Sequence, residues 1–515
     1  MATRTQNSVR NLFTGLAGKI IVFVFAFLTR TVFARLLGAE YSGVDGLYAN
    51  ILSVLSLADL GVNNVFTFFL YKSLAEKDEE RTASVVKSFQ KLYIGIGLFI
   101  LLGGMVVVPF LPLIVNSALP QNEIILYYIL YLVNASASYF FAYKTIVLTA
   151  DQKKYIDNIC TTVFQILMYL AQFVYLLLTH DFLGYLIIQI VTTVLRNVVM
   201  TFIAEKKYPY LAGRIKTAEY PLGRGVLWNN IKATFLYKIC IVLINNTDNI
   251  LISILIGTVY VGKYAYYCML VQYADAYIYL FATSILASIG NLNAEKDEEK
   301  AFRFFKTLNL IFAAMAIVVV CGFSNCIQEF IPIWIGTDFL LGNDVVVAML
   351  LSSYLTTLCS PVWMYRETMG LFREVQYSRI PTVIINIGLS IVLGKYFGIA
   401  GILFATSIAK LSTNLWFEPV VLYRRFGKKV RGYFLMQAGF ALVTLGSVFV
   451  TRLICRYLPT NLIGIVLRAV VSISVSLLIL VLVYGRTEAG KDAAARIKTM
   501  FMRKRRGNGK HEGSD

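Results

Sequence analysis

The segment Ala75-Glu-Lys-Asp-Glu-Glu80, followed by Arg81, decides the fold, because it occurs again as Ala294–Glu299, followed by Lys300. Each copy stands between long apolar segments. The sequence therefore predicts one unit of about 220 residues that is used twice, with an addition at the C-terminal end. Further positions match at the same offset without a gap: Asn11 with Asn230, Lys19 with Lys238, Leu36 with Leu255, Gly38 with Gly257, Tyr41 with Tyr260, Gly43 with Gly262, Tyr48 with Tyr267 and Thr149 with Thr368.

The composition is that of a membrane protein. Of 515 residues, 58% are hydrophobic and only 15% are charged, and the mean hydropathy is +0.68. A soluble protein of this length needs more charge to cover its surface. Apolar runs of about 18 or more residues follow one another from Gly15 to Tyr484, which is the pattern of transmembrane helices. The sequence predicts an all-α polytopic membrane protein with about fourteen spans, at residues 15–37, 44–72, 88–115, 122–149, 156–179, 183–204, 227–256, 261–290, 303–330, 343–367, 380–396, 399–423, 433–454 and 462–484.

Lysine and arginine are concentrated in one set of loops, which predicts the orientation. The repeated segments, the other cation-rich loops and both termini fall on this side and are expected to be cytoplasmic. We expect the first apolar run to be the first helix of the mature protein, because it is longer than the apolar part of a cleaved signal. The net charge of +19 is mainly this topological bias, so no nucleic-acid partner is expected. The alternate loops hold few cations beyond Lys263, Lys395, Arg452 and Arg456.

The two repeated segments are six spans apart in this reading. An even number of spans places them on the same face, so the two six-helix lobes are parallel and related by a pseudo-two-fold axis along the membrane normal. The predicted domains are an N-lobe at 1–221, a C-lobe at 222–423, a pair of extra spans at 424–485 and a basic cytoplasmic tail at 486–515. The external loops are short and no soluble domain can hold a catalytic centre, so we do not expect an enzyme.

The residue inventory excludes several kinds of site. The chain has two histidines and seven cysteines, and no Cys-x-x-Cys pair. No metal site, disulfide framework or cofactor is therefore expected. Nucleophile-elbow, phosphate-loop and zinc-protease motifs are also missing from the sequence.

Ionisable side chains inside spans need a reason, since each costs about 2.5–3.5 kcal/mol at mid-helix. Lys19 and Arg30 are eleven residues apart in the first span, and at about 100° per residue they share one helix face. The equivalent span of the second repeat carries Lys238, Asn245 and Asn249 on one face. We expect these two polar stripes to line a cavity. Lys19 also fits snorkelling to the cytoplasmic surface, so both roles stay open for it.

Further spans carry isolated polar residues. Asp59 and Asp275 occupy equivalent second spans of the repeats and could bind a coupling cation or pair with an intramembrane cation. Structural pairing is the commoner role for such carboxylates. Lys144 and Lys410, in the fourth and twelfth spans, are further candidates for lining a cationic substrate cavity.

An ordered set of short motifs resembles a known family. In the first repeat they include Arg35-Leu-Leu-Gly38, Asp45-Gly-Leu-Tyr48 and Leu55-Ser-Leu-Ala-Asp-Leu-Gly61, followed by the first repeated segment. In the second repeat they are Gly290–Lys300, Trp334-Ile-Gly336, Gly370-Leu-Phe-Arg373 and Trp416-Phe-Glu-Pro419. The set resembles the polysaccharide-transporter branch, the Wzx-type oligosaccharide flippases, of the multidrug/oligosaccharidyl-lipid/polysaccharide (MOP) superfamily. The resemblance covers about residues 5–430.

The resemblance implies a function. It implies alternating-access transfer of an undecaprenyl-diphosphate-linked oligosaccharide from the cytoplasmic to the outer leaflet of a bacterial plasma membrane, for capsule or exopolysaccharide synthesis. The implied partners are that lipid-linked substrate, the bilayer, and the polymerase and glycosyltransferases of the same pathway. Two other functions stay open. A cation-coupled multidrug antiporter of the same superfamily predicts that acidic groups dominate the lobes, and a membrane glycan polymerase or ligase predicts a large external loop.

Overall fold

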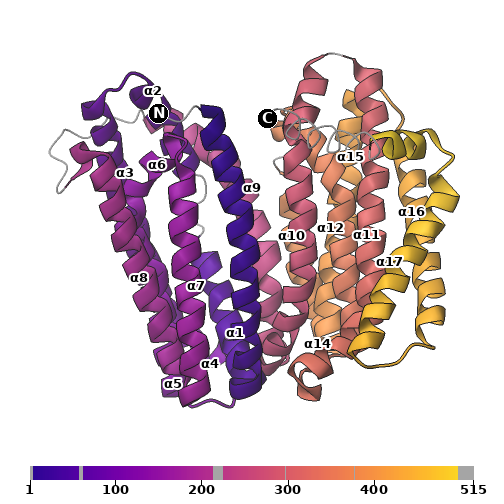
Figure 1. The fold of residues 1–515 in the computed structure, drawn as a ribbon, viewed down its shortest axis with the longest axis horizontal. Helices are drawn as coiled ribbons and strands as arrows, with labels where there is room; N and C mark the ends of the chain where they lie inside the picture. The colour runs from indigo at the N-terminus through magenta and orange to yellow at the C-terminus, as the bar shows by residue number, and fades with distance from the viewer. Residues whose placement is uncertain (1–3, 57–61, 213–223, 296, 376, 497–515) are drawn as a thin grey trace, which may run out of the picture. The chain divides into compact units, whose positions relative to one another are not determined.

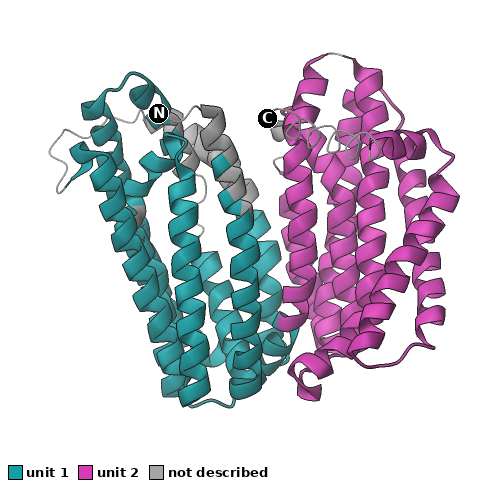
Figure 2. Cartoon of the chain, viewed as in Figure 1, with its two compact units in different colours: residues 1–265 teal, residues 266–515 magenta. Residues whose placement is uncertain are grey.

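The computed structural model describes residues 4–56, 62–212, 224–295, 297–375 and 377–496, and every regular element in these ranges is a helix. Contacts divide the chain into two compact units, residues 1–265 and 266–515 (Figure 2). Unit 1 contains α1 (Arg4–Leu55), α2 (Val62–Ala75), α3 (Glu79–Val107), α4 (Leu111–Ile114), α5 (Gln121–Phe141), α6 (Ile146–Ala150), α7 (Lys154–Thr179), α8 (Phe182–Lys207), α9 (Arg224–Leu255) and the start of α10 (Thr258–Ala294). Unit 2 contains the rest of α10, then α11 (Glu298–Ile335), α12 (Asn343–Thr368), α13 (Phe372–Val375), α14 (Arg379–Ser412), α15 (Asn414–Arg425), α16 (Arg431–Cys455) and α17 (Leu462–Tyr484) (Figure 1).

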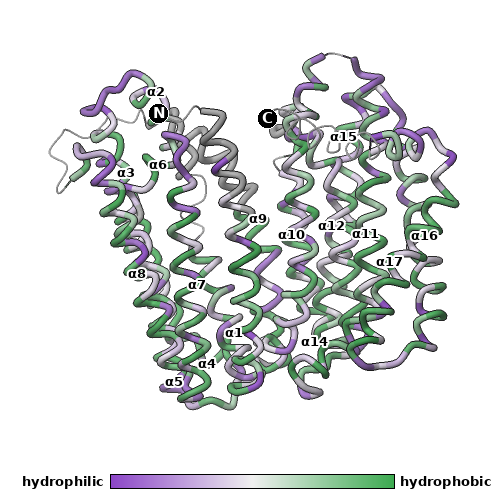
Figure 3. Tube along the Cα trace, viewed as in Figure 1, coloured by the Kyte–Doolittle hydropathy of each residue, from purple (hydrophilic) through white to green (hydrophobic). Residues whose placement is uncertain are grey.

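The predicted membrane-spanning fold is confirmed. Within the described ranges, eleven helices are long and apolar enough to cross a membrane, and Ile239–Leu255 is a shorter apolar helix. Of the eleven, Arg379–Arg425 covers two predicted spans, and Ala17–Leu55 covers the first predicted span and the beginning of the second, 44–72, whose later part contains α2. Ile239–Leu255 covers the C-terminal part of the predicted span 227–256, so each predicted span has a helical counterpart among the described residues. Figure 3 shows hydrophobic positions along the helices and hydrophilic positions gathered at the turns, as expected for segments that cross a bilayer.

Glycines with positive φ reverse the chain inside two of the long helices. Gly38 (φ 80°) interrupts α1, and Gly398 (φ 59°) interrupts α14. Asn386 and Thr406, on opposite sides of Gly398, are joined by a hydrogen bond of 2.7 Å from Nδ2 to Oγ1, so the two halves of α14 lie side by side. Glycine adopts this backbone conformation without the clash of a Cβ atom. Gly257, the repeat equivalent of Gly38, also has positive φ (142°) and stands between α9 and α10.

The repeated segment forms the same local structure in each unit. In unit 1, the carboxylate of Asp78 caps α3 by accepting from the backbone N–H of Arg81 at 2.8 Å. In unit 2, Asp297 caps α11 by accepting from the N–H of Lys300 at 2.9 Å. Each cap is followed by two glutamates in the first helical turn, where negative charge is stabilised by the helix dipole. The internal repeat is therefore structural as well as sequential.

Packing inside unit 1 places α1 against α7 and α9, while α5 packs on α3 and α8. Because α9 packs on α1, α2 and α4, it belongs to unit 1, and the boundary between the units falls between Ala265 and Tyr266. The lobe boundaries that we predict at 221/222, 423/424 and 485/486 stay predictions. Inside unit 2, α11 is the central helix, because it packs against α12, α16 and α17. The tail from 497 onward lies outside the described residues.

Two glycines allow a close helix crossing in unit 1. A Cβ atom added to Gly43 of α1 would meet the backbone carbonyl of Thr258 at the start of α10, and one added to Gly262 would meet the carbonyl of Ala39. The two contacts are equivalent under the internal repeat. Gly43 corresponds to Gly262, and the residue that each glycine meets, Thr258 or Ala39, corresponds to the other. The crossing is further fixed by a hydrogen bond of 2.8 Å from the Thr258 N–H to the carbonyl of Asn116.

Candidate functional site

The turn at Gly38 brings Arg30 against Asp45. These residues lie eight positions before and seven positions after the glycine, so they meet when the two halves of α1 run back along each other. Arg30 Nη1 forms an ion pair with Asp45 Oδ2. In one continuous helix the same residues would be about 22 Å apart along the axis, so the pair depends on the turn.

Neighbouring helices hold this ion pair in place. The Tyr131 hydroxyl of α5 donates a hydrogen bond to Asp45 Oδ1, and the Arg30 guanidinium lies over the Phe33 ring, 5.6 Å from its centroid. The exposed fraction is 8% for the Asp45 side chain but 34% for that of Arg30. The carboxylate is therefore enclosed, while a third of the cation remains accessible.

The other predicted cavity residues of α1 and α9 are placed less tightly. Lys19 is exposed on α1, on the same helix as Arg30, and Asn245 is exposed on α9. Asn249 is half-buried, and its Oδ1 atom is buried without a hydrogen bond among the described residues. The side chain of Lys238 and all of Asp59 lie outside the described residues, so their cavity roles stay predictions.

In unit 2, Asp275 and Lys410 form hydrogen bonds with neighbouring residues of α12. Asp275 Oδ1 of α10 accepts a hydrogen bond of 2.6 Å from Ser353 Oγ. Lys410 Nζ of α14 donates to Ser352 Oγ and Thr356 Oγ1, each at 2.9 Å. The two predicted site residues thus share one polar cluster across three helices, with hydroxyl groups between the opposite charges.

Lys144 has a different environment. It is 3% exposed, lies in the 3-10 turn Ala142–Thr145, and forms an ion pair with Glu205 of α8. Its charge is therefore balanced inside unit 1, and the pair joins the α5–α6 connection to α8. Its predicted role in a diphosphate-facing cavity would require this pair to open.

Unit 2 contains a comparable buried cluster that the sequence did not reveal. Glu418 of α15 accepts from Arg366 Nη1 of α12 at 3.1 Å and from Arg379 Nη2 of α14 at 2.8 Å. Glu418 is 5% exposed and Arg366 is 3% exposed. Arg366 Nη2 also lies 3.6 Å from Oε2 of Glu367, whose side chain is 38% exposed. Ion pairs this enclosed fix the three helices against one another, and removing Glu418 would leave Arg366 with the longer pair to the more exposed Glu367.

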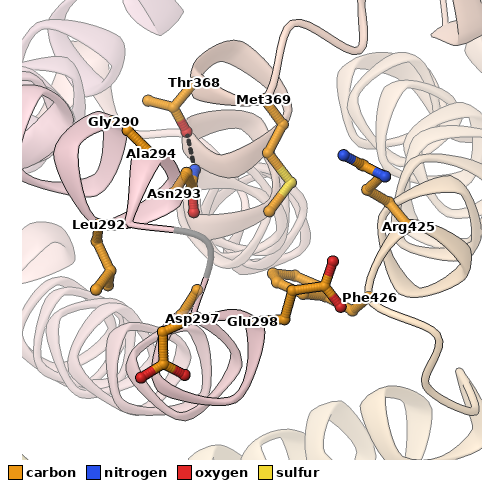
Figure 4. A pocket seen from close by; sticks show the side chains of 11 residues that line it. Gly290, Leu292, Asn293, Ala294, Asp297, Glu298, Thr368, Met369, Arg425 and Phe426 are labelled. Carbon is orange, nitrogen blue, oxygen red and sulfur yellow. Dashed lines mark hydrogen bonds between the residues drawn. The ribbon is translucent and has the colours of Figure 1, made fainter.

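A cavity of about 470 Å³ lies at the second repeated segment, between the ends of α10, α11, α12 and α15; Figure 4 shows the side chains that line it. Asn293 Nδ2 donates to Thr368 Oγ1 at 2.9 Å on one side of it. Asp297, Glu298 and Arg425 supply charges of both signs. Asp297 is already engaged as the cap of α11, so this cavity is better explained as the loop end of the helix bundle than as a selective anion site.

Comparison with known proteins identifies similar solved structures but no sequence family. No family model matches the chain, and no curated protein matches its sequence. Among solved structures, the chain is similar to a lipid II flippase, MurJ, in an inward closed conformation, with a TM-score of 0.63 and 17% identity over 93% of this chain and 98% of that one. It is also similar to an inward-facing multidrug resistance MATE transporter of the MOP superfamily, with a TM-score of 0.60 and 14% identity over 78% and 94% of the two chains.

The chain has the fold of the MOP-superfamily transporters. A third similar structure is a MOP-superfamily transporter from Pyrococcus furiosus, described as having a binding pocket of reverse polarity, with a TM-score of 0.51 and 13% identity over 80% and 93% of the two chains. The identities are too low to carry any residue's role across. The MOP fold and the eleven apolar helices make this a multi-pass membrane protein.

Proposed function

We propose that this protein is a flippase that moves an undecaprenyl-diphosphate-linked oligosaccharide from the cytoplasmic to the outer leaflet of a bacterial plasma membrane by alternating access. The product would supply capsule or exopolysaccharide synthesis. Both termini would lie in the cytoplasm. The Wzx-type motifs of the sequence motivate this choice within the MOP fold.

The extent of the structural match carries the proposal. The match to the lipid II flippase covers 93% of this chain, and the unmatched remainder is shorter than α16 and α17 together, which contain 25 and 23 residues. That match must therefore include part of these two helices. The match to the MATE transporter covers only 78% of the chain, and its unmatched remainder is long enough to contain both helices. A match that extends into the region of α16 and α17 supports the flippase proposal.

Arg30 supports the same conclusion from chemistry. A guanidinium inside an apolar span is costly, but it binds phosphate oxygens through two parallel charge-assisted hydrogen bonds. The accessible third of the Arg30 side chain can meet a diphosphate while Asp45 compensates the charge when no substrate is present. Asp45 in turn keeps its hydrogen bond from Tyr131 when the arginine engages a ligand.

The Asp275–Lys410 cluster favours a second candidate, a cation-coupled drug antiporter. Asp275 is a carboxylate inside a span that could take up a proton or a sodium ion, and its hydrogen bond to Ser353 places it next to Lys410's partner Ser352. Such a group is what coupled efflux requires. The same cluster also suits the coupling step of a flippase, so only transport can separate the two functions.

The test is leaflet transfer of a fluorescent undecaprenyl-diphosphate oligosaccharide in proteoliposomes. We compare the wild type with Arg30→Gln/Asp45→Asn, which removes both charges and keeps similar side-chain volumes, and with Lys238→Ala. Lys395→Gln, which changes an exposed cation with no ion pair among the described residues, serves as the control. We expect at least a tenfold slower transfer in the first two variants, because each charge-assisted hydrogen bond to phosphate contributes about 1.5–3 kcal/mol.

Transfer that is equally fast in every folded variant would retain the flippase and reject the cationic site. Proteoliposomes that transfer no lipid-linked glycan, but expel small organic cations when a proton or sodium gradient is applied, would establish the antiporter instead. Asp275→Asn should then abolish efflux.

A further inference from the structure

A second polar cavity lies in unit 2, where α16 and α17 pack on α11, and its lining includes neither Asp275 nor Lys410. Its volume is about 650 Å³, within the range of small-molecule sites. Its lining includes Glu329 of α11, Arg452 at the end of α16, Arg456 in the following turn and Arg468 of α17. Three arginines and one glutamate give these lining residues a net charge of +2.

Arg468 is built into the wall of the cavity. It is 9% exposed, and its Nη2 donates to the carbonyl of Leu458 at 2.9 Å, which holds the α16–α17 turn against α17. Its Nη1 lies 3.4 Å from Glu329 Oε1, so the glutamate of the lining is already shared with this arginine. The buried Nε makes no hydrogen bond among the residues that the structure describes.

Arg452 and Arg456 carry the uncompensated charge. They are one helical turn apart, both are exposed, and neither forms a side-chain hydrogen bond or ion pair in the described part of the chain. Part of their role can be the favourable interaction of cations with the C-terminal end of α16. That effect needs no cavity and no third arginine, so it does not account for the cluster.

The position of these cations is also unusual. The predicted topology places the α16–α17 turn on the external side, where loops of membrane proteins contain few lysines and arginines. Close arginines repel one another unless an anion lies between them. A group with two or three phosphate oxygens would offset that repulsion, because guanidinium groups match phosphate geometry with paired hydrogen bonds.

The apolar rim of the cavity indicates where this phosphate comes from. Phe449 and Leu453 line the cavity and are 64% and 50% exposed, and they belong to a helix whose outer face is apolar. Exposed apolar side chains of this kind on a membrane-spanning helix contact acyl chains. A ligand with a phosphate at one end and hydrocarbon at the other fits both parts of the site.

We propose that Arg452, Arg456 and Arg468 form a binding site for the phosphate of an anionic lipid headgroup at the α16–α17 end of unit 2. The residues of this site do not include the proposed transport residues Arg30, Asp275 and Lys410. It predicts that the protein retains anionic phospholipid selectively, whatever substrate it moves.

The experiment is native mass spectrometry of the full-length protein, purified in detergent and titrated with phosphatidylglycerol or phosphatidylcholine. The test variant is Arg452→Gln/Arg456→Gln, which changes two exposed side chains and leaves Arg468 with its hydrogen bond to Leu458. Lys395→Gln removes another exposed cation of the predicted external side and is the matched control. We expect the wild type and the control to retain phosphatidylglycerol at least about tenfold better than the double variant does.

Inorganic pyrophosphate distinguishes the two sources of phosphate. If phosphatidylglycerol is retained and pyrophosphate does not displace it, the ligand is the lipid headgroup. If only pyrophosphate binds, and its binding is lost in the double variant, the same arginines recognise a free phosphate compound and the lipid assignment is overturned. Equal retention by the wild type and the double variant, or an equal loss in Lys395→Gln, would overturn the site altogether.

Discussion

The close crossing of α1 and α10 in unit 1 predicts that adding a single methyl group at Gly43 destabilises the protein. Gly43→Ala would place a Cβ atom 2.8 Å from the carbonyl carbon of Thr258, with the carbonyl oxygen closer still. Cβ atoms essentially never approach another heavy atom more closely than about 3.0 Å, so the backbone of α10 must move away. Helix propensity alone favours the substitution, because alanine stabilises a helix by about 1 kcal/mol relative to glycine. The steric cost and the propensity gain therefore have opposite signs.

The surroundings of Thr258 determine which effect is larger. Its N–H donates to the carbonyl of Asn116 at 2.8 Å, and its hydroxyl lies 2.8 Å from Ser253 Oγ. Ser253 Oγ also donates to the carbonyl of Ile114 at 2.7 Å. Moving the Thr258 carbonyl strains this hydrogen-bonded corner, so the clash is not relieved by rotating a side chain. Overpacking of this kind costs about 1–3 kcal/mol, which changes a folding or conformational equilibrium by about 5- to 150-fold.

The assay is thermal stability of the purified protein, measured as the temperature at which half of the monodisperse fraction is lost. Gly46→Ala is the matched control, because it lies one turn further along the same helix and its Cβ would be 3.7 Å from the nearest atom, Val261 Cγ1. We expect Gly46→Ala to be neutral or slightly stabilising and Gly43→Ala to be less stable by several degrees. Gly262→Ala, the repeat equivalent, should behave like Gly43→Ala. If Gly43→Ala and Gly46→Ala have the same stability, the crossing is not as close as the structure has it and the reasoning fails.

Two further predictions concern unit 2 and the repeat. Glu418→Gln should lower the free energy of unfolding by about 3–5 kcal/mol, because it leaves Arg366 and Arg379 without their shared carboxylate, and thermal unfolding of the purified variant measures this loss. An unchanged transition would mean that the two arginines are compensated in another way. Asp297→Ala should cost about 0.5–2 kcal/mol through loss of the α11 cap, and Asp78→Ala should cost the same in unit 1; markedly unequal losses would contradict the structural equivalence of the two capped turns.

The sequence predicts the features that depend on local chemistry. The constant offset between the two repeats implies equal turns in both, and the structure confirms it at the Asp78 and Asp297 caps. Each predicted span has a helical counterpart among the described residues, because a long apolar run can be recognised without knowing its packing partner. The Arg30–Asp45 pair was also within reach, since the two residues stand almost equally far from Gly38. Finding it required the inference that this glycine reverses the chain.

The pairing of buried charges was not predictable in the same way. Lys144 and Glu205 are 61 residues apart, and Arg366 and Glu418 are 52 apart, so their meeting depends on which helices pack together. Hydropathy identifies a helix that crosses the bilayer but not its neighbour or its rotation. Arg468 was missed for a related reason. It lies inside the last apolar span, and only the packing of α17 against α11 brings it to Glu329.

The exposed fraction of the cation divides the ion pairs into two groups: those whose cation a ligand can reach and those whose cation it cannot reach. In the pairs Lys144–Glu205 and Arg366–Glu418 the cation is at most 4% exposed, so a ligand can reach it only if helices separate, at the cost of an uncompensated buried charge. The Arg30–Asp45 pair is different because 34% of the arginine side chain is exposed while its carboxylate has a second donor. Exchange of Asp45 for a phosphate at Arg30 then keeps the arginine paired and breaks no helix contact. Among the predicted cations whose pairing the structure describes, a substrate with a diphosphate would therefore engage Arg30 before Lys144, and substitution of Lys144 should affect stability more than transport.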